Sequence, residues 1–101
     1  MVIFSMYSTY LICYDISDNK RRNKLFECLK DLGLESLQES VFYGFLKHPE
    51  YKGLKAFIRR TLKKPDDKCL IMQSKLTEKD IKDSYGYKNF TLRDPDGFEC
   101  I

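Results

Sequence analysis

The segment YLICYDISDNKRRNKLFECLKDLG, residues 10–33, joins an apolar run, one aspartate and a burst of basic side chains. Its first part, extended back to residue 7, is rich in β-branched and aromatic residues, which fit a pleated and half-buried surface. This composition predicts a central strand over 7–16, covered on at least one face. The strand ends at Asp15 or Ile16, so that Asp15 closes a largely apolar segment.

An amphipathic helix is predicted directly after this strand. Residue types that cap helices come first, at Ser17, Asp18 and Asn19. Apolar residues then recur at spacings of three and four, at Leu25, Cys28, Leu29 and Leu32. Gly33 follows, and a glycine can end a helix in the left-handed conformation.

Period-two alternation in ESLQESVFYGFL, residues 35–46, predicts the next strand. Gly44 marks a bulge or bend within it. If the chain passes a tight turn there, a second short strand lies around 45–47. Pro49 then breaks the pattern, and we interpret His48 as a loop residue beside it.

The second half of the chain predicts one more helix and one more strand. Helical spacing returns through about residue 62, at Leu54, Phe57, Ile58 and Leu62. KKPDDK is a turn, and the apolar run over 69–76 has the length of a strand. Thr77 can cap a helical turn, and residues 90–92 could form a last short strand.

Length and composition favour one domain over 1–101, because 101 residues with 43% hydrophobic side chains can close a single core. The formal net charge of +3 permits anionic partners without demanding them. Cys100 is close to the terminus, whereas three cysteines lie on apolar patterns and are expected to be buried thiols in a reducing cytoplasm: Cys13, Cys28 and Cys69. The opening residues lack signal-peptide features, so we expect a soluble, cytoplasmic protein with no membrane partner.

The order of these elements is β-α-β-β-α-β. This order predicts an α+β, ferredoxin-like fold, an antiparallel sheet with two helices on one face. The other face of so small a sheet is then bare. Burial of that face against a second copy of the chain predicts a homodimer.

Asp15 has two interpretations, because a carboxylate after an apolar strand must be hydrogen-bonded, paired or metal-bound if it is buried. It either caps the following loop through backbone amides or binds a divalent metal. Mg²⁺ is a hard ion that prefers several oxygen ligands, so one carboxylate holds it poorly. A symmetric dimer would supply a second Asp15.

Basic residues are concentrated on both helices. Positive charge at the start of the first helix opposes the helix macrodipole, which favours a phosphate-binding purpose for Lys20, Arg21, Arg22 and Lys24. A basic ridge with spacings of three and four follows on the second helix, at Lys52, Lys55, Arg59 and Lys63. In both cases the alternative is a solvated face that contributes only solubility.

Several enzyme classes lack their motifs in this sequence. His48 is the only histidine, and no serine or carboxylate pattern near it suggests a catalytic triad. A glycine-rich phosphate loop, a Cys/His nucleophile and paired glycosidase carboxylates are also absent.

The residues Tyr14-Asp15-Ile16, the basic helix start, Leu32-Gly33 and Gln38 to Phe42 (QESVF) together resemble one family. It is the second CRISPR-associated (Cas) protein family, small proteins of CRISPR adaptation often described as metal-dependent endoribonucleases. The similarity is strong over 10–46 and weaker but collinear up to the strand at Leu70. Many relatives carry a basic residue where this chain has Ser36.

This resemblance implies a ferredoxin-like homodimer in which the two Asp15 side chains share Mg²⁺ or Mn²⁺. It makes Asp15 the catalytic and metal residue, supported by Tyr14 and Phe42. The nucleic-acid contacts are expected at Lys20, Arg21, Arg22, Lys24, Lys55 and Arg59. A C-terminal tail from about residue 78 is expected to contribute dimer or partner contacts.

Two classes of function follow from the resemblance. The first is a scaffold of spacer acquisition that binds double-stranded DNA and bridges integrase subunits, with possible metal-dependent endonuclease activity. A general base is missing from the sequence pattern, which weakens catalysis relative to scaffolding. The alternative is a toxin-like, metal-dependent endoribonuclease that acts independently on RNA.

Overall fold

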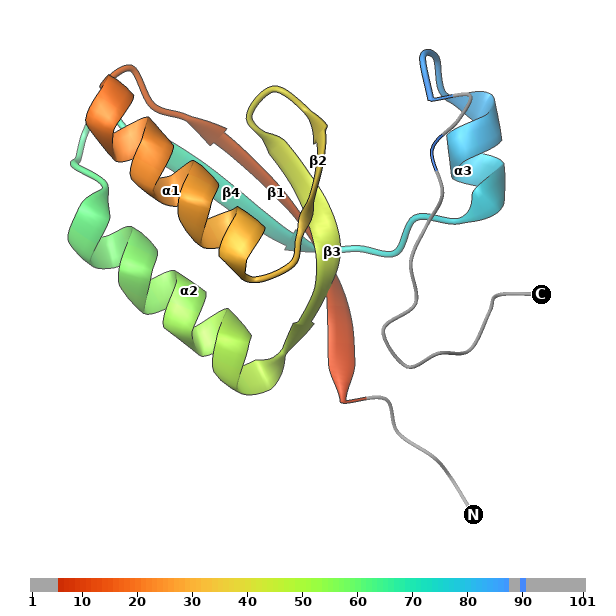
Figure 1. Cartoon of the computed structure of the whole chain (residues 1–101), viewed down its shortest axis with the longest axis horizontal. Coiled ribbons are helices and arrows are strands. Elements are labelled where there is room, and N and C mark those ends of the chain that lie inside the picture. Colours follow the sequence, from red (N-terminus) through yellow and green to blue (C-terminus); the bar gives the residue numbers. More distant parts are fainter. Residues whose placement is uncertain (1–5, 88–89, 91–101) are drawn as a thin grey trace.

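The computed structural model describes residues 6–87 and 90. The elements follow one another as β1 (Tyr7–Asp15), α1 (Asn19–Asp31), β2 (Glu35–Gln38), β3 (Val41–Lys47), α2 (His48–Thr61), β4 (Lys68–Gln73) and α3 (Glu78–Asp83). The four strands form one sheet in the order β2-β3-β1-β4, in which all neighbours are antiparallel. Helices α1 and α2 lie side by side on one face of this sheet (Figure 1). The ferredoxin-like α+β prediction is thereby confirmed.

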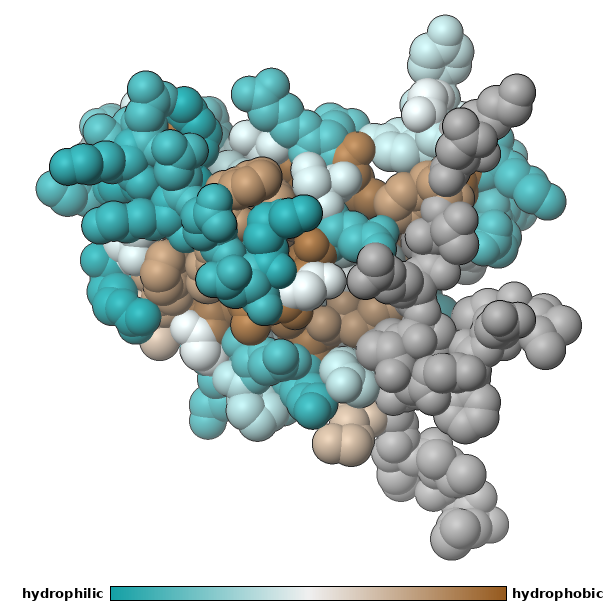
Figure 2. Space-filling model, in the orientation of Figure 1, coloured by the Kyte–Doolittle hydropathy of each residue, from teal (hydrophilic) through white to brown (hydrophobic). Residues whose placement is uncertain are grey.

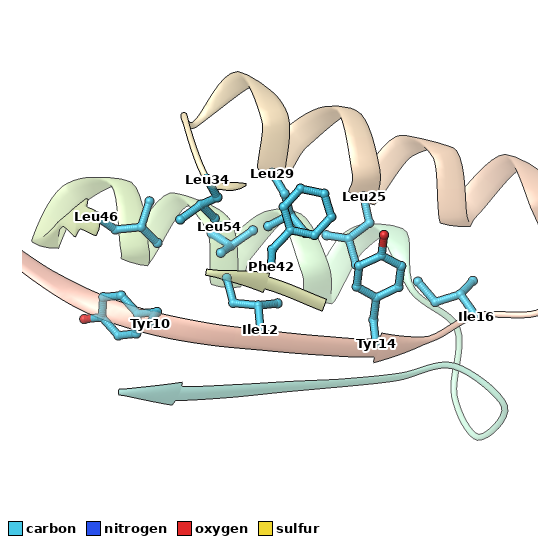
Figure 3. Close-up of a cluster of buried hydrophobic side chains, with 10 residues drawn as sticks. All are labelled: Tyr10, Ile12, Tyr14, Ile16, Leu25, Leu29, Leu34, Phe42, Leu46 and Leu54. Carbon is cyan, nitrogen blue, oxygen red and sulfur yellow. The ribbon is translucent and has the colours of Figure 1, made fainter. Parts of the chain in front are cut away.

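The core fills the space between the sheet and the two helices (Figure 3). Alternate residues of β1, namely Tyr10, Ile12 and Tyr14, point into it and are buried. Leu25 and Leu29 of α1 meet them from above, as the apolar spacing predicts. Further buried members of this cluster are Ile16, Leu34, Phe42, Leu46 and Leu54. Hydrophilic side chains dominate the outer surface over α1 and α2 (Figure 2).

The predicted helix ends agree with the structure. The Asp18 side chain accepts a hydrogen bond from the Arg21 amide at 2.9 Å, which caps α1. Gly33 has a φ of +85°, a left-handed conformation that glycine adopts without strain. Thr77 caps α3 by accepting from the Asp80 amide at 3.1 Å.

The position of the hairpin was predicted wrongly. The turn between β2 and β3 lies at Glu39–Ser40, and Gly44 is inside β3 rather than at a bend. Ser40 has a φ of +63°, a conformation that glycine or asparagine usually provides, so the sequence carries no turn signal there. Gly44 instead allows a close approach, because a Cβ at this position would lie 3.3 Å from the Leu34 Cα and 2.7 Å from its Cδ2. The β-bulge occurs in β2, between Ser36 and Gln38.

The interpretation of His48 as a loop residue was also wrong, because α2 begins at His48. Pro49 lies in the first turn of this helix, where its missing amide costs no intrahelical hydrogen bond. The Glu50 carboxylate accepts from the Lys47 amide at 2.8 Å and caps the helix start. Pro49 therefore stands at the start of α2, directly after β3, and does not mark a loop.

The second face of the sheet is partly covered by the segment that follows β4. The Leu76 amide donates to the Tyr43 hydroxyl at 2.8 Å, and the Tyr87 hydroxyl donates to Gln38 Oε1 at 2.9 Å. Tyr43 is therefore only 4% exposed although it points away from α1 and α2. Leu70 and Met72 of β4 stay uncovered, at 59% and 44% exposure.

Some predictions concern residues outside the described part of the chain. Thr91, Leu92 and Cys100 lie there, whereas Phe90 is described and belongs to no strand. Cys13, Cys28 and Cys69 are free, half-buried thiols. Burial raises the pKa of Cys69 to about 11, so this thiol stays protonated at neutral pH. Among the described helices none has the length and apolar character to cross a membrane.

Candidate functional site

Asp15 is the last residue of β1 and is exposed. Because side chains alternate along a strand, it lies on the opposite sheet face from its buried neighbours Tyr14 and Ile16. Lys68, the first residue of β4, pairs with it across the ladder. Directly opposed residues of antiparallel strands share a face, so a positive charge is placed beside Asp15. Exposure answers the question that the sequence raised, since this carboxylate avoids the cost of burial.

Among the described residues, Asp15 does not belong to a larger group of metal-ligating side chains. Within residues 6–87 and 90, His, Cys, Asp and Glu side chains do not gather in a group of three or more. An exposed carboxylate oxygen suits Mg²⁺ or Mn²⁺, which keep several waters and often bind through one or two carboxylates and a substrate phosphate. Asp15 thus fits such an ion as one ligand, and the Asp15 of a second copy of the chain would add another carboxylate.

Tyr14 and Phe42 lie on the helix side of the sheet, not beside the Asp15 carboxylate. Their rings stack at 6.3 Å between centroids, and Phe42 is fully buried. The Tyr14 amide donates to the Ser40 carbonyl at 3.0 Å, which fastens β1 to the hairpin turn. Burial raises the pKa of the Tyr14 hydroxyl, against the opposing effects of a hydrogen bond with Ser40 and the charge of Arg22. Both residues therefore belong to the packed core on the helix side of the sheet.

Arg21 is engaged in an ion pair inside the chain. Its Nε and Nη2 atoms donate to the two carboxylate oxygens of Asp67 at 2.6 Å and 3.2 Å. The Asp67 side chain has no exposed area and accepts a further bond from the Lys63 amide at 3.0 Å. This fork joins the start of α1 to the turn before β4. Arg21 was predicted to bind nucleic acid, which stays a prediction, and in the structure its guanidinium is paired with Asp67.

Replacing Asp67 by asparagine is expected to lower stability at neutral pH and to weaken its acid dependence. Hydrogen bonds from Arg21, and then from the Lys63 amide, hold the pKa of Asp67 below the ordinary aspartate value of 3.8. The lowered pKa contributes stability that is present above about 3.8 and lost as pH falls through the folded value. Urea unfolding at about pH 7 and about pH 3 measures it. Equal losses for Asp67→Asn at both pH values would contradict this expectation.

Arg22 contacts the loop that follows Asp15. Its Nη1 donates to the carbonyls of Ile16 at 2.9 Å and Ser17 at 3.4 Å, and its Nη2 donates to Asn19 Oδ1. Asn19 is the first residue of α1, so the guanidinium links the strand end, the loop and the helix start. The charge that opposes the helix dipole is thus compensated by carbonyl oxygens.

The other predicted basic residues lie on the outer side of the helices. Lys20 and Lys24 of α1 and Arg59 of α2 are exposed. Lys55 is half-buried, with its Nζ 4.9 Å from the centroid of the Tyr51 ring, a cation–π contact that leaves its ammonium at the surface. These four cations are placed where an anionic partner can reach them.

Lys68 and Asp67 are two residues whose positions in the structure the sequence analysis did not predict: one lies opposite Asp15 and the other pairs with Arg21. Lys68 belongs to the KKPDDK turn, and only the strand register places it opposite Asp15. Asp67 forms its ion pair with a residue 46 positions away, which no local pattern reveals. One signal in the sequence could have pointed to Lys68. It directly precedes the apolar run that forms β4, and an antiparallel neighbour of β1 begins where β1 ends.

Comparisons with known proteins agree with this architecture. The family model described as "CRISPR associated protein Cas2" matches residues 6–83. A protein named CRISPR-associated endoribonuclease Cas2 1 from Francisella tularensis subsp. novicida is 35% identical over 91% of this chain and 94% of its own length. CRISPR-associated endoribonuclease Cas2 from Desulforudis audaxviator is 36% identical over 71% of this chain and 66% of its own length.

Two solved structures share the fold. The crystal structure titled "Crystal structure of cas2" covers 94% of this chain and 98% of its own, with a TM-score of 0.60 and 28% identity. A hypothetical protein TT1823 from Thermus thermophilus covers 68% of this chain and 83% of its own, with a TM-score of 0.63 and 35% identity. The family model spans most of the chain and the Francisella relative spans nearly all of it, and the chain therefore belongs to the Cas2 family of CRISPR-associated proteins.

Proposed function

We propose that this protein is a dimeric scaffold of spacer acquisition that binds duplex DNA and bridges integrase subunits. The observation that supports it best is the exposed cationic side of α2, next to the exposed lysines of α1. Side chains that contact only phosphates bind a duplex without reading its sequence. A bridging role needs this surface and no chemistry.

Spacer integration reconstituted with the cognate integrase tests this scaffold directly. The full chain is expected to be required for insertion of a spacer duplex into a repeat-containing plasmid. Integration at the same rate without this protein would contradict the proposal. An integrase gene and a repeat array beside the gene would argue against the toxin-like alternative.

Duplex binding is expected to weaken when both Lys55 and Arg59 are replaced by glutamine. Each lost phosphate contact reduces the slope of log K against log salt by roughly 0.9, whatever the DNA sequence. Fluorescence anisotropy at several salt concentrations measures this slope. Replacing the exposed Lys75 and Lys82 by glutamine is the matched control, because it removes the same charge outside α1 and α2. If both double variants changed the slope equally, general charge rather than α2 would explain binding.

A homodimer is supported by the uncovered part of the second sheet face. Leu70 and Met72 are exposed there, in register with Cys13 and Leu11 of β1. Asp15, the last residue of β1, and Lys68, the first residue of β4, form the final pair at one end of the same two strands. A second copy on this face would bury the apolar residues and bring a second Asp15 close, which would add a carboxylate ligand.

Leu70→Glu is expected to weaken this dimer more than about tenfold in its dissociation constant, because a carboxylate would be buried without a partner. Analytical ultracentrifugation over a concentration series measures the change. Asn23→Glu on α1 adds the same charge at an exposed position on the helix side and is the control. A dimer unaffected by Leu70→Glu would place the interface elsewhere.

Metal-dependent nuclease activity is a second candidate, favoured by the names of the relatives, which describe them as endoribonucleases. A bound Mg²⁺ or Mn²⁺ polarises a phosphodiester and lowers the pKa of a coordinated water. Asp15 is the residue that would bind the ion, and Lys68 beside it would attract the phosphate. RNA is the substrate that the relatives' names suggest.

A further inference from the structure

Arg22 donates hydrogen bonds to the carbonyls of Ile16 and Ser17, which follow Asp15 directly, and to the side chain of Asn19 at the start of α1. We infer that Arg22 is a positioning residue that fixes the end of β1, and with it the Asp15 carboxylate, rather than a phosphate contact. This inference rests on the proposed metal site for its functional consequence. The bracing itself is a property of the folded chain and is measured separately.

The bracing follows from where the three acceptors lie. Asp15 forms the last pair of the β1–β4 ladder, so the carbonyls of Ile16 and Ser17 lie beyond the sheet. Ile16 is buried, and a buried backbone carbonyl needs a partner. Arg22 supplies it at 2.9 Å from the second turn of α1. The residue directly after Asp15 is therefore fastened both by packing and by a charged donor.

The geometry of the guanidinium explains why an arginine is required. Nη1 donates to Ile16 and Ser17, while Nη2 of the same planar group donates to Asn19 Oδ1. A lysine would keep the charge but has a single, strongly hydrated ammonium on a flexible stem and loses this fork. To bind a phosphate with these same donors, Arg22 would have to release the loop. Lys24 is exposed on the same helix, and it could bind a phosphate without releasing the loop.

Charge and positioning have opposite effects on metal affinity, which makes the inference testable. Removing a positive charge near Asp15 favours a divalent cation by Coulomb's law. Loss of positioning by an outer hydrogen-bond partner lowers metal affinity, typically by ten- to a hundredfold. Arg22→Lys retains the charge and removes the fork, so it isolates the positioning effect. Lys24→Ala removes a positive charge from the same helix and leaves the hydrogen bonds of Arg22 intact.

The first measurement is the ¹⁵N order parameter of the Ile16 and Ser17 amides in the full-length protein. Rigid backbone has a value of about 0.85 and flexible backbone a value below about 0.6. We expect Arg22→Lys to move Ile16 and Ser17 toward the flexible value, and Lys24→Ala to leave them unchanged. Asn19→Ala removes one acceptor and is expected to give a smaller change, which keeps the test valid if an Arg22 variant folds poorly.

The second measurement is Mn²⁺ affinity, followed by electron paramagnetic resonance of the free ion. Arg22→Lys is expected to lower it on the order of tenfold, whereas Lys24→Ala is expected to leave it equal or raise it. Unchanged order parameters in Arg22→Lys would overturn the inference. If the unaltered protein binds no Mn²⁺, the metal part of the proposed function fails, and the order parameters alone decide whether Arg22 braces the loop.

Discussion

Asp15→Ala is expected to abolish Mn²⁺ binding and any metal-dependent cleavage, while leaving the fold and duplex binding intact. The carboxylate is exposed, so its removal changes stability by no more than about 0.5 kcal/mol. A metal that polarises the phosphodiester contributes several kcal/mol to transition-state stabilisation, and its loss slows cleavage by a hundredfold or more, at about 1.4 kcal/mol per tenfold. Gel-based cleavage of labelled RNA and DNA, together with Mn²⁺ titration, measures both effects.

Two comparisons make the Asp15→Ala result decisive. Asp31→Ala removes an exposed carboxylate from the far end of α1 and is expected to keep full metal binding. Integration with the cognate integrase is expected to survive in Asp15→Ala if scaffolding is the function. Loss of integration in a folded, dimeric Asp15→Ala protein would count against the scaffold, and persisting cleavage would exclude Asp15 as the metal ligand.

Phe42→Ala is expected to cost about 3–5 kcal/mol of the free energy of unfolding, a large share of the 5–15 kcal/mol available to a domain. Phe42 is fully buried, stacks on Tyr14, and meets the Phe26 ring edge-on at 5.6 Å between centroids. The cavity left at the centre of the core would remove these contacts together. Urea unfolding followed by circular dichroism measures the loss.

Phe26→Ala is the control for Phe42, because Phe26 is 37% exposed and shares the same ring contact. Its truncation is expected to cost about 1 kcal/mol, mainly the aromatic pair. A Phe42→Ala protein that retained its stability but lost nucleic-acid binding would contradict the packing role. The expected loss of stability would instead show that Phe42 of β3 acts through packing in the core, as its burial indicates.

Local sequence patterns determined the elements that carry strong signals. The apolar strand ending at Asp15, the cap at Asp18 and the left-handed Gly33 all agree with the structure. Each depends on the chemistry of neighbouring residues, such as a side-chain oxygen beside free helix amides. The prediction of the β2–β3 turn failed because Ser40 adopts a positive φ, although serine is not a residue type that usually indicates this conformation.

The site was predicted in part, because its residues combine local and distant determinants. The position of Asp15 at a strand end is local, and its exposure follows from the alternation of the strand. The partners of Arg21 and Arg22 could not be predicted, since a guanidinium at the surface of a helix has many possible acceptors. Tertiary packing brings Asp67 to one and the loop carbonyls to the other.

The sequence by itself determined that this protein has a ferredoxin-like order of elements, an aspartate at the end of its first strand and two basic helices. Only the tertiary structure decided which of the basic residues have hydrogen-bond partners inside the chain. It assigned Arg21 to Asp67 and Arg22 to the loop after Asp15, and it placed Lys68 opposite Asp15. The physical reason is that hydrogen bonds and strand register depend on distances in space, which the spacing of residues along the chain does not contain.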